Sequence, residues 1–166
     1  MANTVVFETS KGTFHIELDP SVAPKTVENF LRYVDAGHYE GTVFHRVIPG
    51  FMAQGGGFDA TYAKKATQAP VQNEASSKAK NVRGSVAMAR TSDPHSATCQ
   101  FFVNVSDNGF LDKDQAADGF GYTVFGRVTQ GMDVIDAMVA SPTGSGGPFA
   151  KDAPVTPIVI KSAKRA

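Results

Sequence analysis

The apolar residues of this chain are of the kinds that favour β-sheet. Its 166 residues include 18 Val, 5 Ile and 12 Phe, but only 3 Leu. β-Branched and aromatic side chains fit the pleated, half-buried surface of a sheet. The composition therefore predicts a mainly β protein. A chain of this length also favours a single domain, residues 1–166, built around one core.

The N-terminal residues predict a β-hairpin. Thr4–Glu8 and Thr13–Leu18 flank a turn at residues 10–12, and the second segment alternates strictly between apolar and polar residues. Such a period of two, with one wet face, is typical of a half-buried strand.

Two helices and six more strands are expected along the rest of the chain. Pro24–Ala36 carries apolar residues at helical spacing, with a proline in the first turn and Gly37 at the exit, and a shorter helix is expected at Asp133–Val139. Eight antiparallel strands would close into a barrel that their own side chains fill, which places any active site outside it. The six further strands are expected at Thr42–Val47, Phe51–Gly55, Ser85–Met88, Gln100–Val105, Thr123–Val128 and Pro157–Lys161.

Charge and cysteine content argue against several kinds of partner. Sixteen Lys and Arg balance sixteen Asp and Glu, so the chain has no general attraction for nucleic acid or anionic membranes. The first residues do not resemble a secretory signal, and no window approaches the ~18 apolar residues of a spanning helix. One cysteine, Cys99, cannot form an internal disulfide. We therefore expect a cytoplasmic monomer without nucleic-acid or membrane partners.

The common catalytic motifs are missing from the sequence. There is no CxxC or HExxH, and the four histidines show no ligand spacing on one helix, so no metal site is expected. The sequence also lacks a P-loop, a G-x-G-x-x-G and a G-x-S-x-G. No histidine is positioned to activate Cys99, which we expect to be an inert thiol. No cofactor is therefore expected.

A groove on the outside of the sheet is the best candidate for a site. In a strand over residues 100–105, Gln100, Phe102 and Asn104 share one face, and the residues between them share the opposite, core-facing side. This arrangement exposes an aromatic ring between two amides, on a surface that should be polar. The pattern indicates a shallow binding groove, although a single surface phenylalanine without a role would explain it equally well.

Five segments form one ordered pattern over almost the whole chain: Phe44–Phe58 (FHRVIPGFMAQGGGF), Gly84–Arg90 (GSVAMAR), Gln100–Asn104 (QFFVN), Phe110–Asp112 (FLD) and Val124–Val128 (VFGRV). The pattern resembles the cyclophilin family of peptidyl-prolyl cis–trans isomerases, and is most similar to its small single-domain bacterial members. The resemblance implies a closed eight-stranded antiparallel barrel capped by two α-helices, which agrees with the elements predicted above. It also implies an enzyme without a cofactor or a covalent intermediate.

The resemblance also implies which residues form the site. The family's catalytic arginine falls on Arg46, and Gln54 corresponds to the glutamine that contacts both this arginine and the substrate. Ala89 and the backbone of Arg90 correspond to the segment that pairs with the substrate main chain, and Gln100 lines the neighbouring groove. The apolar pocket for proline falls on Phe51, Met52, Phe102 and Leu111.

Three departures from the family pattern fall in this region. Phe110 stands where many members have tryptophan, and Tyr122 stands where many have a pocket histidine; both are counted among the substrate-binding residues. Arg90 replaces a common asparagine, and one extra residue lies between Met88 and Gln100. Since the tryptophan supplies an indole donor to cyclosporin in relatives, we expect weak binding of cyclosporin-type inhibitors.

The function that follows is acceleration of X–Pro bond rotation in proline-containing peptides and in unfolded or folding proteins. Arg46 would stabilise the twisted amide while the apolar pocket holds the proline ring. One alternative is a non-catalytic module that binds proline peptides, or a holding chaperone. Another is a barrel that carries a small ligand, against which the abundance of phenylalanine argues.

Overall fold

The fold is built on one long antiparallel sheet. The computed structural model describes residues 3–76, 78–116, 118–146 and 149–166. Within these residues the elements, in chain order, are β1 (Thr4–Thr9), β2 (Gly12–Leu18), α1 (Pro24–Asp35), β3 (Arg46–Ile48), β4 (Met52–Gly55), β5 (Ser85–Met88), β6 (Phe101–Asn104), the 3-10 helix η1 (Gly109–Leu111), β7 (Val124–Gln130), α2 (Met132–Val139), β8 (Thr143–Gly146), β9 (Phe149–Pro154) and β10 (Ile160–Arg165).

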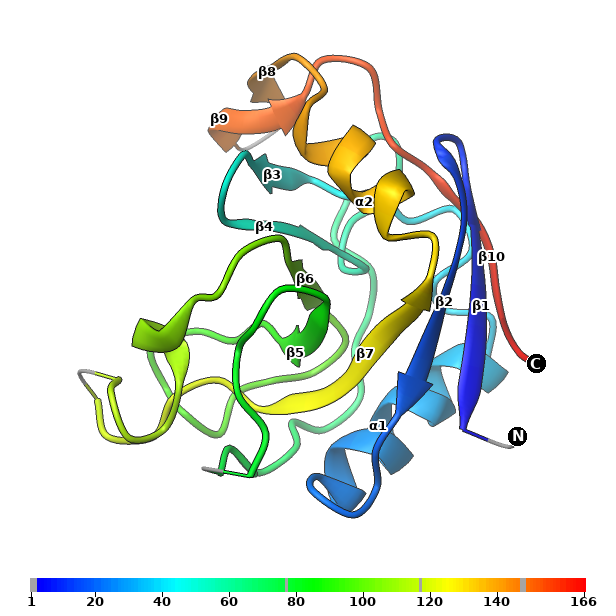
Figure 1. Cartoon of the computed structure of the whole chain (residues 1–166). Helices are drawn as coiled ribbons and strands as arrows, with labels where there is room; N and C mark the ends of the chain where they lie inside the picture. The colour runs from blue at the N-terminus through cyan, green and yellow to red at the C-terminus, as the bar shows by residue number, and fades with distance from the viewer. Residues whose placement is uncertain (1–2, 77, 117, 147–148) are drawn as a thin grey trace.

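Eight of the strands form a single curled sheet in the order β10-β1-β2-β7-β5-β6-β4-β3, and every pairing is antiparallel. A short bridge joins its two ends: the Phe44 N–H donates to the Ile158 carbonyl at 3.0 Å, and the Ile160 N–H donates to the Thr42 carbonyl at 2.7 Å. Figure 1 shows α1 at the bottom and α2 at the top of the curled sheet. The expected mainly β fold with an eight-stranded antiparallel sheet and two helices is confirmed.

Aromatic rings fill the space inside the curl. Phe7 stacks on Phe14 with ring centroids 5.0 Å apart, and Phe30 of α1 lies 5.0 Å from Phe125 and 5.6 Å from Phe101. All five side chains are fully buried. Aromatic pairs at these separations add to the free energy gained from apolar burial. Because side chains occupy the interior, a ligand site must lie on the outer face of the sheet.

The structure differs from the predicted elements mainly at the sheet's ends. β3 begins at Arg46 because Thr42 and Val43 leave its line to bridge Asp59 and Val159. β10 runs later than predicted because its ladder with β1 extends to Arg165. The β8–β9 hairpin and η1 were not predicted, since their Gly-, Pro- and Ser-rich segments lack apolar alternation. Among the described residues, no helix has the length and apolar character needed to cross a membrane.

His45 lies inside an aromatic cluster between the main sheet and the β8–β9 hairpin. Its ring is stacked 4.9 Å from Phe149 and lies edge-on to Phe58, also at 4.9 Å. The side chain is buried, and its Nδ1 has no hydrogen-bond partner among the described residues. Burial, with a smaller effect from the charge of Arg46, lowers the pKa of His45 to about 4. The cluster therefore holds a neutral imidazole.

This histidine predicts a loss of stability in mild acid. The unfolded chain takes up a proton near pH 6.5, whereas folded His45 takes one up only near pH 4, so the free energy of unfolding should decrease as the pH falls from 6.5 to 4. The full difference corresponds to about 3 kcal/mol. Urea unfolding across this range should show the decrease, and His45→Phe should remove most of it. Burial also lowers the pKa of His38, which accounts for a smaller residual slope. An undiminished slope in His45→Phe would contradict this assignment.

Candidate active site

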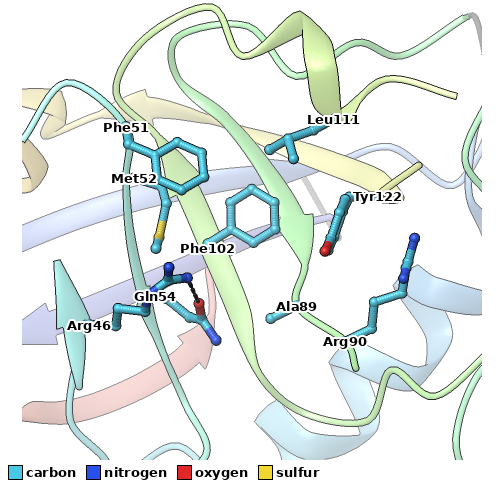
Figure 2. A pocket seen from close by; sticks show the side chains of 9 residues that line it. All are labelled: Arg46, Phe51, Met52, Gln54, Ala89, Arg90, Phe102, Leu111 and Tyr122. Atoms are coloured by element: carbon cyan, nitrogen blue, oxygen red, sulfur yellow. Dashed lines mark hydrogen bonds between the residues drawn. The ribbon is translucent and has the colours of Figure 1, made fainter. Parts of the chain in front are cut away.

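A pocket of about 150 Å³ lies on the outer face of the sheet, opposite the aromatic core. Its lining combines one end of the sheet with the loop that follows β6 (Figure 2). The lining residues are Arg46, Phe51, Met52, Gln54, Ala89, Arg90, Phe102, Leu111 and Tyr122. Nine of the eleven side chains predicted from the sequence therefore meet in one place.

Strand register explains why these residues share a face. Side chains directly opposite one another in antiparallel strands project from the same face of the sheet. One row of such partners crosses the pocket: Arg46 of β3, Gln54 of β4, Phe102 of β6 and Ala87 of β5. The adjacent row faces the core and is entirely apolar: Val47, Ala53, Val103 and Val86. Alternation along each strand thus separates pocket from core.

The pocket floor is a second hydrophobic cluster, distinct from the main core. Met52, Phe102 and Leu111 are buried in it, and Phe51 packs against it from the turn before β4. The ring of Tyr122 meets Phe102 edge-on, with centroids 5.9 Å apart. The expectation of an exposed Phe102 was wrong: only 4% of this residue is exposed, because the segment after β6 folds back over it. The result is an apolar recess rather than a flat groove.

A buried network of amides supports this recess from below, and the sequence analysis did not foresee it. The Asn104 amide donates to Asn81 Oδ1 at 3.0 Å, and the Asn108 amide donates to Asn104 Oδ1 at 2.8 Å and to the Phe51 carbonyl at 3.0 Å. Asp112 accepts the Asn81 backbone N–H at 2.6 Å. Since buried amides and carboxylates need partners, the network fixes the segments that carry Phe51, Leu111 and Tyr122. Asn81, Asn104 and Asn108 are the sequence feature from which this network could have been predicted.

Arg46 stands at the polar edge of the recess, and its guanidinium is exposed. It donates to Gln54 Oε1 over a long distance of 3.4 Å, and the Gln54 amide donates in turn to Gln100 Oε1 at 3.1 Å. Among the described residues, no carboxylate oxygen lies within 4.0 Å of it. Most of its N–H donors are therefore directed at solvent beside an apolar recess.

Gln100 and Phe110 lie next to the pocket rather than in its lining. Gln100 lines an adjoining polar groove of about 250 Å³, which shares Gln54, Ala89 and Arg90 with the pocket. Gly57 makes room for it, because a Cβ there would approach Gln100 Cγ to 2.5 Å. Phe110 forms the outer rim: it is 59% exposed, with its ring 5.7 Å from that of Phe51.

Other candidate chemistry lies away from this pocket. Cys99 is buried, and burial raises the pKa of its thiol, so the reactive thiolate is disfavoured. No group of three or more His, Cys, Asp or Glu suited to a metal ion occurs in the part of the chain that the structure describes.

The pocket offers an apolar recess and a cationic hydrogen-bond donor, a combination suited to an apolar ring attached to a polar amide.

Comparison with known proteins finds relatives over nearly the whole chain. Residues 4–165 match the family model described as cyclophilin type peptidyl-prolyl cis-trans isomerase/CLD. Peptidyl-prolyl cis-trans isomerase cyp18 of Streptomyces antibioticus is 56% identical, covering 98% of each chain. Peptidyl-prolyl cis-trans isomerase B of Escherichia coli is 48% identical, covering 95% of this chain and 96% of that protein. The crystal structure of a Cryptosporidium parvum cyclophilin type isomerase in the presence of the dipeptide Ala-Pro has a TM-score of 0.80 at 26% identity, covering 98% of each chain.

Proposed function

This chain belongs to the cyclophilin family of peptidyl-prolyl cis–trans isomerases, and we propose that Arg46 and the adjoining recess carry out its catalysis. The protein is thus an enzyme that accelerates rotation about X–Pro peptide bonds. The observation that carries the mechanism is the exposed guanidinium of Arg46, weakly held by Gln54, at the edge of an apolar recess.

The reaction has a kinetic problem rather than a thermodynamic one. Rotation about a peptide bond faces a barrier of ~18–20 kcal/mol because resonance gives the C–N bond double-bond character. The two X–Pro isomers differ by only about 0.5–1 kcal/mol, but uncatalysed exchange takes roughly 10–100 s. Turnover at ~10³ s⁻¹ requires about 5–7 kcal/mol less barrier. The enzyme must therefore bind the twisted amide better than either planar form.

Arg46 meets this requirement without transferring a proton. At the twisted transition state the prolyl nitrogen loses conjugation and gains lone-pair character. An N–H of the guanidinium directed at that nitrogen forms a stronger hydrogen bond to it than in either planar isomer. Arginine suits the role because it stays charged and presents several donors in a fixed plane. Gln54, held by Gln100, orients this plane.

The recess anchors the proline ring while the preceding carbonyl group rotates. Phe51, Met52, Phe102 and Leu111 offer an apolar surface of the right character for a pyrrolidine ring. Burial of three methylene groups contributes only about 2–3 kcal/mol, so binding should be weak and tolerant of the surrounding sequence. Tolerance of this kind suits an enzyme whose substrates are proline-containing peptides and unfolded or folding proteins.

We extend the proposal to the context in which the enzyme works. The family match over residues 4–165 supports a single isomerase domain spanning 1–166. The balanced charge supports an enzyme without nucleic-acid or membrane partners, and the lone free Cys99 suits a reducing compartment such as the cytoplasm. We further propose that it acts as a monomer and without a cofactor.

Replacement of Arg46 tests the mechanism. Arg46→Ala should lower kcat/KM for a short Ala-Pro peptide by about 10²–10³-fold, the usual loss on removal of one transition-state donor. Because the recess is unchanged, the affinity for the same peptide should change by less than about threefold. Exchange spectroscopy by NMR measures both quantities.

The matched control is Arg127→Ala, which removes an exposed arginine that pairs with Glu17 outside the pocket. Its kcat/KM should equal that of the wild type. Full activity in Arg46→Ala would refute the mechanism and would return the pocket to a role in peptide binding alone.

The pH dependence gives a second test. Neither the arginine nor the glutamine of the proposed mechanism changes protonation near neutrality, so kcat/KM should be flat from about pH 6 to 9. The rate of exchange of an Ala-Pro peptide, followed over that range in one buffer system, measures this. A bell-shaped profile centred near neutrality would indicate an acid–base group that the mechanism lacks.

Cyclosporin sensitivity tests the role assigned to Phe110 at the rim. Phe110→Trp supplies an indole N–H that phenylalanine cannot offer, and cyclosporin affinity should rise about tenfold, the equivalent of one net hydrogen bond. Phe120→Trp is the matched control: Phe120 is 41% exposed, lies in the same loop and contacts His95 instead of the pocket. Equal affinity gains in both variants, or none in Phe110→Trp, would contradict the prediction.

A further inference from the structure

A second arginine, Arg90, borders the same pocket but has a very different environment. Its side chain is only 4% exposed, and its guanidinium makes four hydrogen bonds. Nε and Nη2 donate to the Gly121 carbonyl at 3.3 and 2.9 Å, Nη1 donates to the Thr91 carbonyl at 2.9 Å, and Nη2 donates to Asp118 Oδ2 at 2.6 Å. Unlike Arg46, this arginine has little donor capacity left for a substrate.

Three of the four hydrogen bonds of the Arg90 guanidinium go to Asp118 and Gly121, in the segment that leads into Tyr122. Asp118 Oδ1 accepts the backbone N–H groups of Phe120 at 2.9 Å and Gly121 at 3.1 Å, while its Oδ2 accepts from Arg90. The two backbone hydrogen bonds, and to a smaller extent the hydrogen bond from Arg90, lower the pKa of Asp118 to about 2. The carboxylate thus stays charged at physiological pH and links the turn to the guanidinium.

The guanidinium also lies over the ring of Tyr122, with Cζ 4.3 Å from the ring centroid. The same ring meets Phe102 of the pocket floor edge-on, 5.9 Å between centroids. In Figure 2 the ring stands between the Arg90 side chain and the recess. Stacking of a guanidinium on an aromatic face is favourable, and more so when both groups are shielded from water.

The backbone before Tyr122 packs closely against the segment after η1. Gly121 has φ +74°, and a Cβ there would approach the Leu111 carbonyl oxygen to 2.8 Å, so the chain crosses the segment after η1 in close contact. Its carbonyl accepts from Arg90 and from the Asn73 amide at 2.9 Å. The orientation of the Tyr122 ring therefore depends on groups outside its own segment, of which Arg90 contacts both backbone and ring.

We propose that Arg90 is a positioning residue that fixes Tyr122 as the wall of the proline recess. The two arginines then have different roles: Arg46 acts on the amide, and Arg90 shapes the cavity for the ring. The proposal rests on the proposed function of the pocket. The recess holds the ring equally in the planar and twisted states, so loosening its wall should weaken binding without slowing the chemical step.

The test is the effect of Arg90→Lys on the separate kinetic constants for a short Ala-Pro peptide. Lysine keeps the charge but loses the planar fork and the stack, and KM should rise about fivefold while kcat stays within about twofold. A residue that only stabilised the fold would lower the melting temperature and leave the KM of the folded protein unchanged. The matched control is Arg83→Lys, since Arg83 forms a bidentate pair with Asp136 outside the pocket. Its KM should not change.

A double-mutant cycle shows whether Arg90 acts through Tyr122. In a Tyr122→Ala background, Arg90→Lys should add less than about twofold to KM, because the ring that it positions is gone. Should Arg90→Lys fold poorly, Asp118→Asn removes the ion pair while its amide oxygen can still accept from the turn, and KM should rise about two- to threefold.

Three results would overturn the proposal. The first is an unchanged KM in Arg90→Lys, or in Asp118→Asn if Arg90→Lys folds poorly. The second is a fall in kcat in Arg90→Lys as large as that in Arg46→Ala, and the third is a pair of KM effects that multiply in the double mutant. Failure of the proposed function would appear elsewhere, as an unchanged kcat in Arg46→Ala.

Discussion

The antiparallel register across β3, β4, β6 and β5 is the constraint on which the rest of the structure depends. It places Arg46, Gln54 and Phe102 in one row on the outer face and sends the adjacent row of valines and alanine into the aromatic core. A slip of one residue would exchange the two rows, burying a guanidinium among phenylalanines and exposing the core. The large free energy of apolar burial inside the curl therefore also enforces the geometry of the site outside it.

An outer face of a sheet is a poor place for a binding recess unless something covers it. Here the chain between β6 and β7 folds back and encloses a second apolar cluster, so that Phe102 is nearly as buried as the core residues. The asparagine network satisfies the polar groups that this covering segment buries, and without such partners each would cost about 1–3 kcal/mol. The recess is thus a small supplementary core, left open on the side where we propose that the proline ring binds.

The sequence determines the parts of this design that depend on local pattern. β5 begins and ends at the predicted Ser85 and Met88, and alternation in residues 100–105 correctly separated core-facing from outward side chains. It did not predict the burial of Phe102 or the contacts of Arg90, because both depend on where a distant segment of low periodicity folds back. The β8–β9 hairpin was missed for a related reason: glycine and serine contribute little apolar pattern, and the hairpin is held by contacts such as that of Phe149 with His45.

Two adjacent residues, His45 just before β3 and Arg46 at its start, illustrate how the fold separates a titrating side chain from the proposed catalytic one. Arg46 faces the solvent beside the recess, while His45, one residue earlier, is buried between Phe58 and Phe149. Protonation of that histidine, whose pKa is lowered to about 4, therefore acts mainly on the stability of the folded state. In the proposed mechanism Arg46, a permanent cation, is oriented by the neutral amides of Gln54 and Gln100. None of these three groups gains or loses a proton near neutrality. An isomerisation that breaks no covalent bond needs a fixed field at one nitrogen atom. In the proposed mechanism Arg46, which has no carboxylate oxygen within 4.0 Å among the described residues, supplies that field beside the apolar recess.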